Sequence, residues 1–323
     1  MKKSILFLLV FGFVFTLNIF SQTNEVNTTN KKVAVTFDDL PFNHARLVSN
    51  DEMKFWVEKL IAKIKQEKIP AVAFVNEFKL EVNGERDPER VKILKTWLDA
   101  GVELGNHTHS HKSGNKVPIE EYKEDIIKGE RTITELMAQK NMKPRFFRHP
   151  FLQTGRTLEY KHEVEKFLAG RGYTIAPVTI DNAEWIFAAA YDKAVKSNDE
   201  ELKSKIGNEY IEYMRAKFKY YEQQSQRLFG RQIKQILLIH SNRINADYLT
   251  KLCNMIRGEN YEFISLEEAL QDEAYKSPDT FTGAGGISWM DRWALTRGKK
   301  GDFFKDEPRT PKYIMEIAGV DSE

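Results

Sequence analysis

Short apolar runs alternate along this chain with longer segments in which apolar residues recur every three or four positions. The runs at residues 33–37 and 71–75 lie between polar or turn residues, which predicts strands buried on both faces. A shorter strand is predicted at 102–105. Amphipathic helices are predicted after the first two runs, beginning near Ser49 and near Asp87.

Strand and helix continue to alternate towards the C-terminus. Further helices are predicted at residues 119–140, 157–169 and 245–257. Further strands are predicted at 145–147, 236–240 and 261–264, and another starts at Tyr173 and reaches Asp181. This order is typical of a parallel α/β sheet. Seven strand candidates, each followed by polar residues at the same end, favour a distorted (β/α) barrel of about seven parallel strands over an open sheet.

Two segments depart from this alternation. Residues 186–230 are charged and helical, and we interpret them either as a helical insertion beside the site or, more simply, as a pair of outer-layer helices. Residues 271–323 are irregular and contain several Gly and Trp residues, so we predict a C-terminal extension packed on the domain. The main domain is therefore predicted to span residues 31–270.

The first residues have the pattern of an export signal. Lys2 and Lys3 precede an apolar run at residues 5–20, and Ser21 follows this run. We predict a signal peptide at 1–21, a polar linker at 22–30, and a periplasmic or secreted protein without a stable membrane anchor after cleavage. A permanent anchor is the less favoured alternative, because the run is short for a span and no basic flank follows it.

Charge and cysteine content narrow the function. The chain has 49 basic and 47 acidic residues, a net charge of +2, and this balance does not indicate a nucleic-acid partner. Cys253 is the single cysteine, so no disulfide can form within the chain, and we interpret it as a buried structural residue.

The candidate chemistry lies where two predicted strands end. Asp38 and Asp39 follow the first strand, and His107 and His111 follow the third. Two His residues four positions apart can face one metal if they lie on a helical turn, and an Asp can complete a two-His, one-carboxylate set with open positions. Each stretch alone also fits an ordinary histidine cluster or a turn before Pro41.

Five segments, taken in order, resemble the motifs of the NodB-type polysaccharide deacetylases, carbohydrate esterase family four. The similarity extends over residues 31–270. The five segments are Thr36-Phe37-Asp38-Asp39-Leu40-Pro41, His107-Thr108-His109-Ser110-His111, Arg148-His149-Pro150-Phe151, Asp181-Asn182-Ala183-Glu184-Trp185 and Leu237-Leu238-Ile239-His240.

The resemblance implies a distorted barrel and a metal-dependent hydrolase that removes N-acetyl groups from sugars. Asp39, His107 and His111 would bind the metal, usually Zn²⁺, with Co²⁺, Mn²⁺ or Ni²⁺ as possible replacements. Asp38 would act as general base on the metal-bound water.

The remaining motif residues would complete the site. Arg148 would orient the base, and His240 would protonate the leaving amine, its pKa tuned by a carboxylate from Asp181 or Glu184. The residues that would contact the substrate are Phe151, through its backbone N–H, Trp185 and Leu238.

Differences from the family pattern and alternative functions follow from the same motifs. Leu40 stands where the family usually has Gly, and we expect its side chain to narrow the cleft. His109 is expected to lie at the rim rather than to bind metal. The partner is predicted to be an acetylated carbohydrate. An O-acetyl esterase of the xylan type and a catalytically silent glycan-binding protein remain alternatives.

Overall fold

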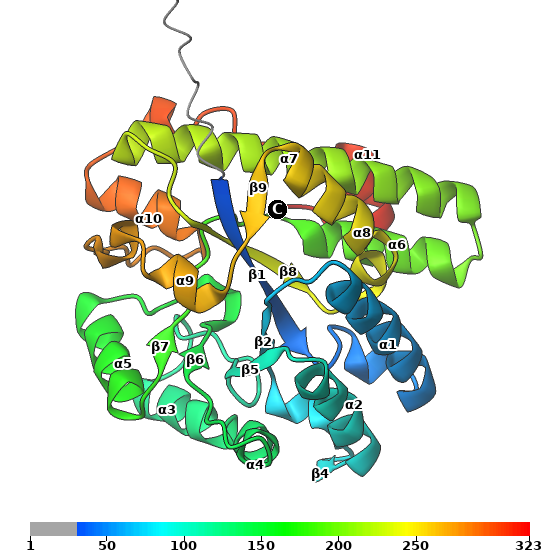
Figure 1. Ribbon diagram of the computed structural model, residues 1–323. Helices are drawn as coiled ribbons and strands as arrows, with labels where there is room; N and C mark the ends of the chain where they lie inside the picture. The colour runs from blue at the N-terminus through cyan, green and yellow to red at the C-terminus, as the bar shows by residue number, and fades with distance from the viewer. Residues whose placement is uncertain (1–30) are drawn as a thin grey trace, which may run out of the picture.

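The computed structural model describes residues 31–323, so the predicted signal peptide and linker lie outside the described residues. Strands occupy the middle of the molecule and helices surround them (Figure 1). No helix within residues 31–323 has a stretch long and apolar enough to cross a membrane.

Seven parallel strands form the main sheet, one for each predicted strand. They are β1 (Lys31–Leu40), β2 (Val72–Val75), β5 (Glu103–Asn106), β6 (Phe146–Phe147), β7 (Thr174–Ile175), β8 (Gln235–His240) and β9 (Tyr261–Phe263). The strand predicted to run from Tyr173 to Asp181 is limited to two residues, and only an isolated bridge at Ile180 follows it. The strand order is β7-β6-β5-β2-β1-β8, and β9 pairs with the beginning of β1. A small antiparallel pair, β3 (Glu81–Val82) and β4 (Glu85–Arg86), was not predicted.

The sheet curls into a distorted barrel. A parallel bridge joins Ile180, which follows β7, to Leu237 in β8. The segment after β7 therefore connects the two outer strands of the sheet order. The predicted fold class, a distorted (β/α) barrel, is confirmed.

Both faces of β1 are buried, as the apolar run predicts. Val33, Val35 and Phe37 pack in the large core between the strands and the surrounding helices. Ala34 points to the other face and packs in a separate cluster with Val72, among other residues of the strands. β1 has no solvent-exposed face between Val33 and Phe37, and its carboxylates, Asp38 and Asp39, come near the end that reaches the site.

Eleven α-helices are present in residues 31–323. They are α1 (Asn50–Gln66), α2 (Pro88–Asp99), α3 (Ile119–Lys128), α4 (Arg131–Ala138), α5 (Leu158–Gly170), α6 (Glu184–Lys196), α7 (Glu200–Phe229), α8 (Arg243–Gly258), α9 (Leu266–Leu270), α10 (Trp289–Thr296) and α11 (Lys312–Ala318). The predicted cap of α1 is formed: the Glu52 N–H donates to the Ser49 hydroxyl at 3.2 Å.

The single helix predicted at 119–140 is wrong, because the chain forms α3 and α4 with a break at Gly129. A Cβ at Gly129 would lie 2.6 Å from the Thr108 carbonyl carbon and 2.8 Å from Asn106 Oδ1. The helix therefore ends where its backbone approaches the loop that carries the His cluster. Apolar spacing cannot reveal such a contact, since it depends on a distant segment.

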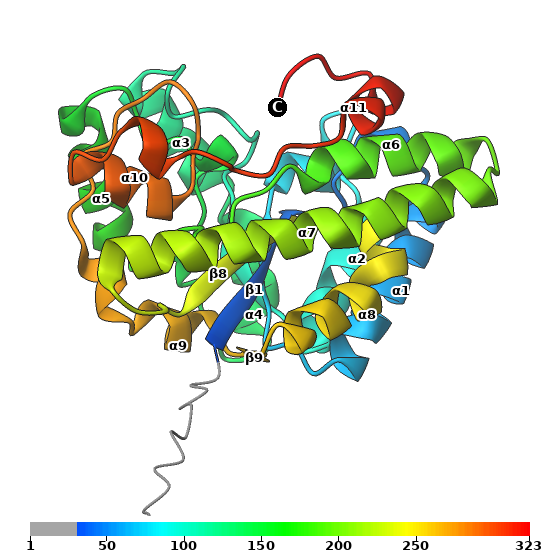
Figure 2. The same ribbon diagram turned by 90° about the horizontal axis from the view of Figure 1, so that it is seen from above.

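The long helix α7 spans the molecule from α10 at one end to α11 near the other (Figure 2). It packs on α6 and α8, and the chain after α10 runs beside it towards α11. The interrupting segment is thus a pair of helices, α6 and α7, and the C-terminal part of the chain packs against both.

Candidate active site

The candidate residues gather at the carboxyl ends of the parallel strands. Asp38 and Asp39 are near the end of β1, His107 follows β5 directly, and His240 is the last residue of β8. Asp38 pairs in register with His240, so these two side chains lie on neighbouring strands. Parallel strands bring their following residues to one edge, and α/β folds place their sites there.

Asp39, His107 and His111 form a group whose ligand atoms all lie within 4.8 Å of one another. Asp39 Oδ1 is 3.7 Å from His107 Nε2 and 3.5 Å from His111 Nε2. Two ligands bound tetrahedrally at about 2.0–2.2 Å from one zinc ion lie roughly 3.3–3.6 Å apart. The spacing of these atoms therefore fits a single metal ion.

Two further contacts support this fit. His107 Nδ1 lies 2.8 Å from the Arg148 carbonyl oxygen, which can only accept a hydrogen bond, so Nδ1 carries the proton and Nε2 offers its lone pair to the group. Asp39 Oδ1 is buried without a hydrogen-bond partner among the described residues. A buried carboxylate oxygen without a partner is costly, and a bound cation would remove this cost.

The loop that carries the two His residues is not helical. Thr108 and His111 have positive φ values of 65° and 56°. The Thr108 N–H donates to Asn106 Oδ1 at 2.7 Å, and the His111 N–H donates to the Thr108 hydroxyl at 3.1 Å. The imidazoles converge because of this tight turn, and not because of the helical turn that their spacing suggested. His109 points to Glu81 instead, with 3.0 Å between Nε2 and Oε1.

Asp38 is buried beside Arg148. Its Oδ2 lies 3.5 Å from Arg148 Nη1, and Arg148 Nη2 donates to the Thr36 hydroxyl at 2.9 Å. Burial raises the pKa of Asp38 to about 6, although Arg148 and His240 act to lower it. A carboxylate with a raised pKa accepts protons more readily near neutral pH than an exposed Asp does.

Sequence reasoning missed Lys79, which is buried next to Asp39. Its ammonium lies 3.1 Å from Asp39 Oδ2 and donates to the Asn43 carbonyl at 2.9 Å. Burial acts to raise the pKa of Asp39, but Lys79 and the facing His residues outweigh it and hold that pKa well below its usual range. A single Lys between apolar residues has no sequence signal that distinguishes it from a surface Lys.

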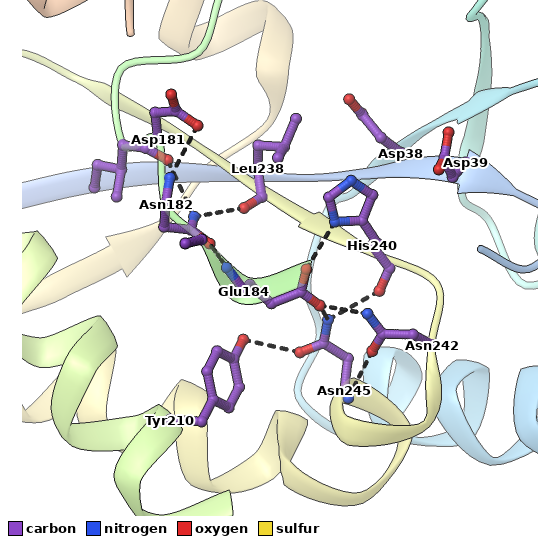
Figure 3. A network of polar contacts seen from close by, with 12 residues as sticks. Asp38, Asp39, Asp181, Asn182, Glu184, Tyr210, Leu238, His240, Asn242 and Asn245 are labelled. Carbon is purple, nitrogen blue, oxygen red and sulfur yellow. Dashed lines mark hydrogen bonds and ion pairs between the residues drawn. The ribbon is translucent and has the colours of Figure 1, made fainter. Parts of the chain in front are cut away.

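His240 is held by a network of polar contacts at the beginnings of α6 and α8 (Figure 3). Glu184 Oε2 lies 2.7 Å from His240 Nδ1, and Asn242 and Asn245 donate to the other oxygen of Glu184. Tyr210 in turn donates to Asn245 Oδ1 at 2.9 Å. Burial acts to lower the pKa of His240, but Glu184 outweighs it and raises that pKa to about 9.

Asp181 is not part of this network. Among the described residues no hydrogen bond or ion pair joins it to His240, and its carboxylate accepts from the neighbouring Asn182 N–H at 2.9 Å. Glu184 alone of the two predicted carboxylates therefore contacts the histidine. Burial raises the pKa of Asp181 to about 6.

One cavity of about 970 Å³ contains the site. The three candidate ligands, Asp38 and His240 all line it, together with Phe151, Trp185 and Leu238. Trp185 is 42 % exposed and offers a face to a ligand. Leu40 is fully buried in the core and does not line the cavity, so the expectation that it narrows the cleft is wrong.

The fold and the site together define a class: α/β barrels with a candidate metal centre at the carboxyl ends of their strands. Residues 25–174 match the model of the polysaccharide deacetylase family, and the resemblance inferred from the motifs is confirmed. The family model describes polysaccharide deacetylases, and the match includes the first three of the five motifs.

Individual relatives are similar over part of the chain. A peptidoglycan-N-acetylglucosamine deacetylase from Bacillus cereus is 30% identical over 154 residues, 48% of this chain and 46% of the relative. The chain thus spans about half the length of this curated protein. Among solved structures, a peptidoglycan N-acetylglucosamine deacetylase has a TM-score of 0.48 at 21% identity, over 74% of this chain and 88% of the other. A chitin deacetylase from the fungus Colletotrichum lindemuthianum has a TM-score of 0.47 at 19% identity, over 76% and 89%.

Proposed function

We propose that this chain is a zinc-dependent deacetylase that hydrolyses the N-acetyl group of an acetylated sugar or polysaccharide. The observation that carries the proposal is the pairing of Asp38 with Arg148 and of His240 with Glu184 beside the three candidate metal ligands, in one cavity. The family match of residues 25–174 supports the same reaction.

The metal would be held by Asp39, His107 and His111, whose spacing fits one ion. When bound, a divalent ion polarises the acetyl carbonyl and lowers the pKa of water. Imidazole and carboxylate ligands suit zinc, and a three-ligand set leaves positions open for water and substrate.

Asp38 is the proposed general base. The attacking water adds its oxygen to the acetyl carbon and gives its proton to Asp38, while Arg148 fixes the orientation of the carboxylate at 3.5 Å. The backbone N–H of Phe151, in a turn where this residue has a φ of 56°, is the proposed donor to the oxyanion.

His240 is the proposed general acid. Its Nδ1 is occupied by Glu184, so Nε2 is the nitrogen that can donate a proton to the leaving nitrogen as the C–N bond breaks. The products are acetate and the free amine. An amide needs this proton, because an unprotonated amine anion is a very poor leaving group.

The substrate would lie between Trp185, Leu238 and Phe151, which line the cavity around the reacting groups. The predicted signal peptide supports an exported enzyme, periplasmic or secreted, that acts on an acetylated carbohydrate outside the cytoplasm.

Acetate release tests the proposal. The purified full-length protein, loaded with zinc, should release acetate from N-acetylated chito-oligosaccharides or from peptidoglycan. Asp38→Asn should lower the rate by about 10² or more while zinc still binds, and His109→Ala should not. The proposal would be wrong if neither substrate released acetate with zinc, cobalt, manganese or nickel.

A further inference from the structure

The cavity that contains the candidate metal ligands is also lined by residues of the interrupting helices and of the C-terminal extension. Asp181 lies after β7, Lys217 on α7 and Asp291 on α10, and Glu307 follows in the extension; all four line the same cavity as the candidate metal ligands. We call these four residues the distal compartment. In Figure 3 the carboxylates of Asp181 and Asp38 point to the same side of the strands, with Leu238 between them.

The distal compartment has three carboxylates and one cation. Lys217 Nζ lies 2.6 Å from Glu307 Oε1 and is used by this pair. Within residues 31–323, neither Asp181 nor Asp291 has an ion-pair partner within 4.0 Å. Asp291 is only 8 % exposed, and its Oδ1 has no hydrogen-bond partner in the same range.

These two carboxylates are poised to receive a positively charged group. Burial, together with the neighbouring Glu307 and Asp181, raises the pKa of Asp291 to about 7. Like charges held close together in a buried site disfavour ionisation, and an incoming cation relieves this repulsion. A buried carboxylate oxygen without a partner gains most from a charged hydrogen-bond donor.

The positions of the carboxylates in the distal compartment do not favour a metal ion as their partner. Among the described residues, Asp39, His107 and His111 form the group whose atoms are close enough to share one metal ion, and the distal compartment does not form another. A ligand that brings an ammonium group together with other donors can reach separated carboxylates. An amino sugar has this chemistry, since its ring carries one amine and several hydroxyls.

We propose that the distal compartment binds a sugar unit with a free primary amine, next to the N-acetylated unit at the reacting groups. This inference rests on the proposed function. It makes the preferred substrate a partly deacetylated glycan, so that each amine produced would favour reaction at a neighbouring unit. The cavity of about 970 Å³ is at the upper end of the range for ligand pockets, which suits more than one sugar unit.

Selectivity between two trimers tests the assignment. The ratio of kcat/KM for a chito-oligosaccharide trimer with one free amine to that for the fully acetylated trimer should exceed one. Asp291→Asn should lower this ratio about tenfold, as expected for one charge-assisted hydrogen bond. Lys217→Met should raise it, because it removes the positive charge and frees Glu307. Glu316→Gln, an exposed carboxylate on α11, is the matched control and should leave the ratio unchanged.

Calorimetry separates this inference from the proposed function. A fully deacetylated glucosamine trimer should bind the zinc-loaded protein more tightly than the acetylated trimer, even if no acetate is released from any substrate, and Asp291→Asn should remove the difference. The inference would be overturned if the folded, zinc-loaded protein bound the two trimers with equal affinity. So would binding of free lysine as tight as that of the glucosamine trimer, because the compartment would then recognise any ammonium. Melting temperatures of the variants confirm that each is folded.

Discussion

Asp38 and His240 face each other across neighbouring strands, and their surroundings drive them to opposite protonation states. Burial raises the pKa of Asp38 to about 6, so this group is mostly ionised at neutral pH. Glu184 raises the pKa of His240 to about 9, so this group is mostly protonated there. Two neighbouring groups whose pKa values are shifted to either side of neutrality can serve as base and acid in one reaction.

The pH dependence of kcat/KM should reveal this arrangement. Activity should fall as pH rises through about 9, because His240 then loses the proton that the leaving nitrogen needs. Glu184→Gln removes the charge that raises the pKa of His240 and leaves burial, which lowers it, so the alkaline limb should move to lower pH. Asp181→Asn is the control, and its alkaline limb should stay in place because Asp181 does not contact His240. A limb that moved equally in both variants would contradict the assignment.

Removal of the acid should affect amides more than esters. His240→Ala should reduce amide hydrolysis by about 10²–10⁴. An alcohol is a better leaving group, so cleavage of an O-acetylated xylan oligomer should fall less. Rates on both substrates with the same zinc-loaded variant measure the difference. Equal losses on the two substrates would argue against a proton transfer from His240.

Some residues of the site could be predicted from the sequence and others could not. Asp38, Asp39 and His240 stand where apolar strand runs stop, and this position alone places them at one rim. Asn245 and Lys79 act only through tertiary contacts, one to Glu184 and the other to Asp39. No local pattern marks such partners, because their neighbours in space are far away in the chain.

At the scale of elements, α10 supports the turn that presents Phe151. Arg292, on α10 and fully buried, donates to the Leu152 carbonyl at 3.2 Å and to the Thr154 hydroxyl. Its Nε donates to Asp279 at 2.8 Å. Arg292 therefore ties the C-terminal extension to the loop after β6, where Phe151 and Leu152 have positive φ values of 56° and 54°.

Loss of this support should reduce turnover without removing the metal. Arg292→Gln should lower kcat by about tenfold or more, because misplacement of a positioned donor by a fraction of an ångström weakens its effect. Zinc affinity should remain, since none of its candidate ligands contacts Arg292. Arg297→Gln, just after the same helix, is the control and should keep kcat. Arg292→Lys keeps the positive charge but cannot bind both the Leu152 carbonyl and the Thr154 hydroxyl. A loss of kcat in this variant would therefore show that the geometry of the contacts matters, and not the charge alone.

The elements themselves were predicted where the pattern of apolar residues is local. The strands and the cap of α1 follow from short runs and from Ser49. The break at Gly129 and the turn from Thr108 to His111 depend on the packing of two segments against each other. The spacing of four residues correctly predicted that the imidazoles of His107 and His111 lie close together. The expected helical turn is wrong, because a tight loop brings them together.

At the scale of the whole molecule, metal binding should stabilise the fold. A ligand at a hundred times its Kd adds about 2.7 kcal/mol to the free energy of unfolding, which corresponds to a rise in Tm of roughly 4 °C for a chain of this size. Zinc should raise the Tm and a chelator should reverse the rise. Asp39→Asn should abolish most of it, whereas His109→Ala should keep it. A Tm insensitive to zinc would contradict the candidate metal site.

The candidate site draws on the whole described chain. Its metal ligands come from residues 39–111, whereas its acid, the carboxylate behind that acid and the distal compartment come from residues 181–307. The match to the family model ends at residue 174, before the residues of the acid, its carboxylate and the distal compartment. Similarity of the first part to deacetylases therefore does not describe the part of the cavity where selectivity is proposed to reside.

The pairing of β1 has a consequence for how the protein can be made. One edge of β1 pairs with β2, which follows it closely, and near its beginning with β9. The other edge pairs with β8, and both β8 and β9 are more than 190 positions later in the chain. A nascent polypeptide, or a fragment cut at residue 174, exposes an apolar strand with unsatisfied backbone groups, which invites intermolecular association. Soluble expression should therefore require the gene to be kept whole through β9.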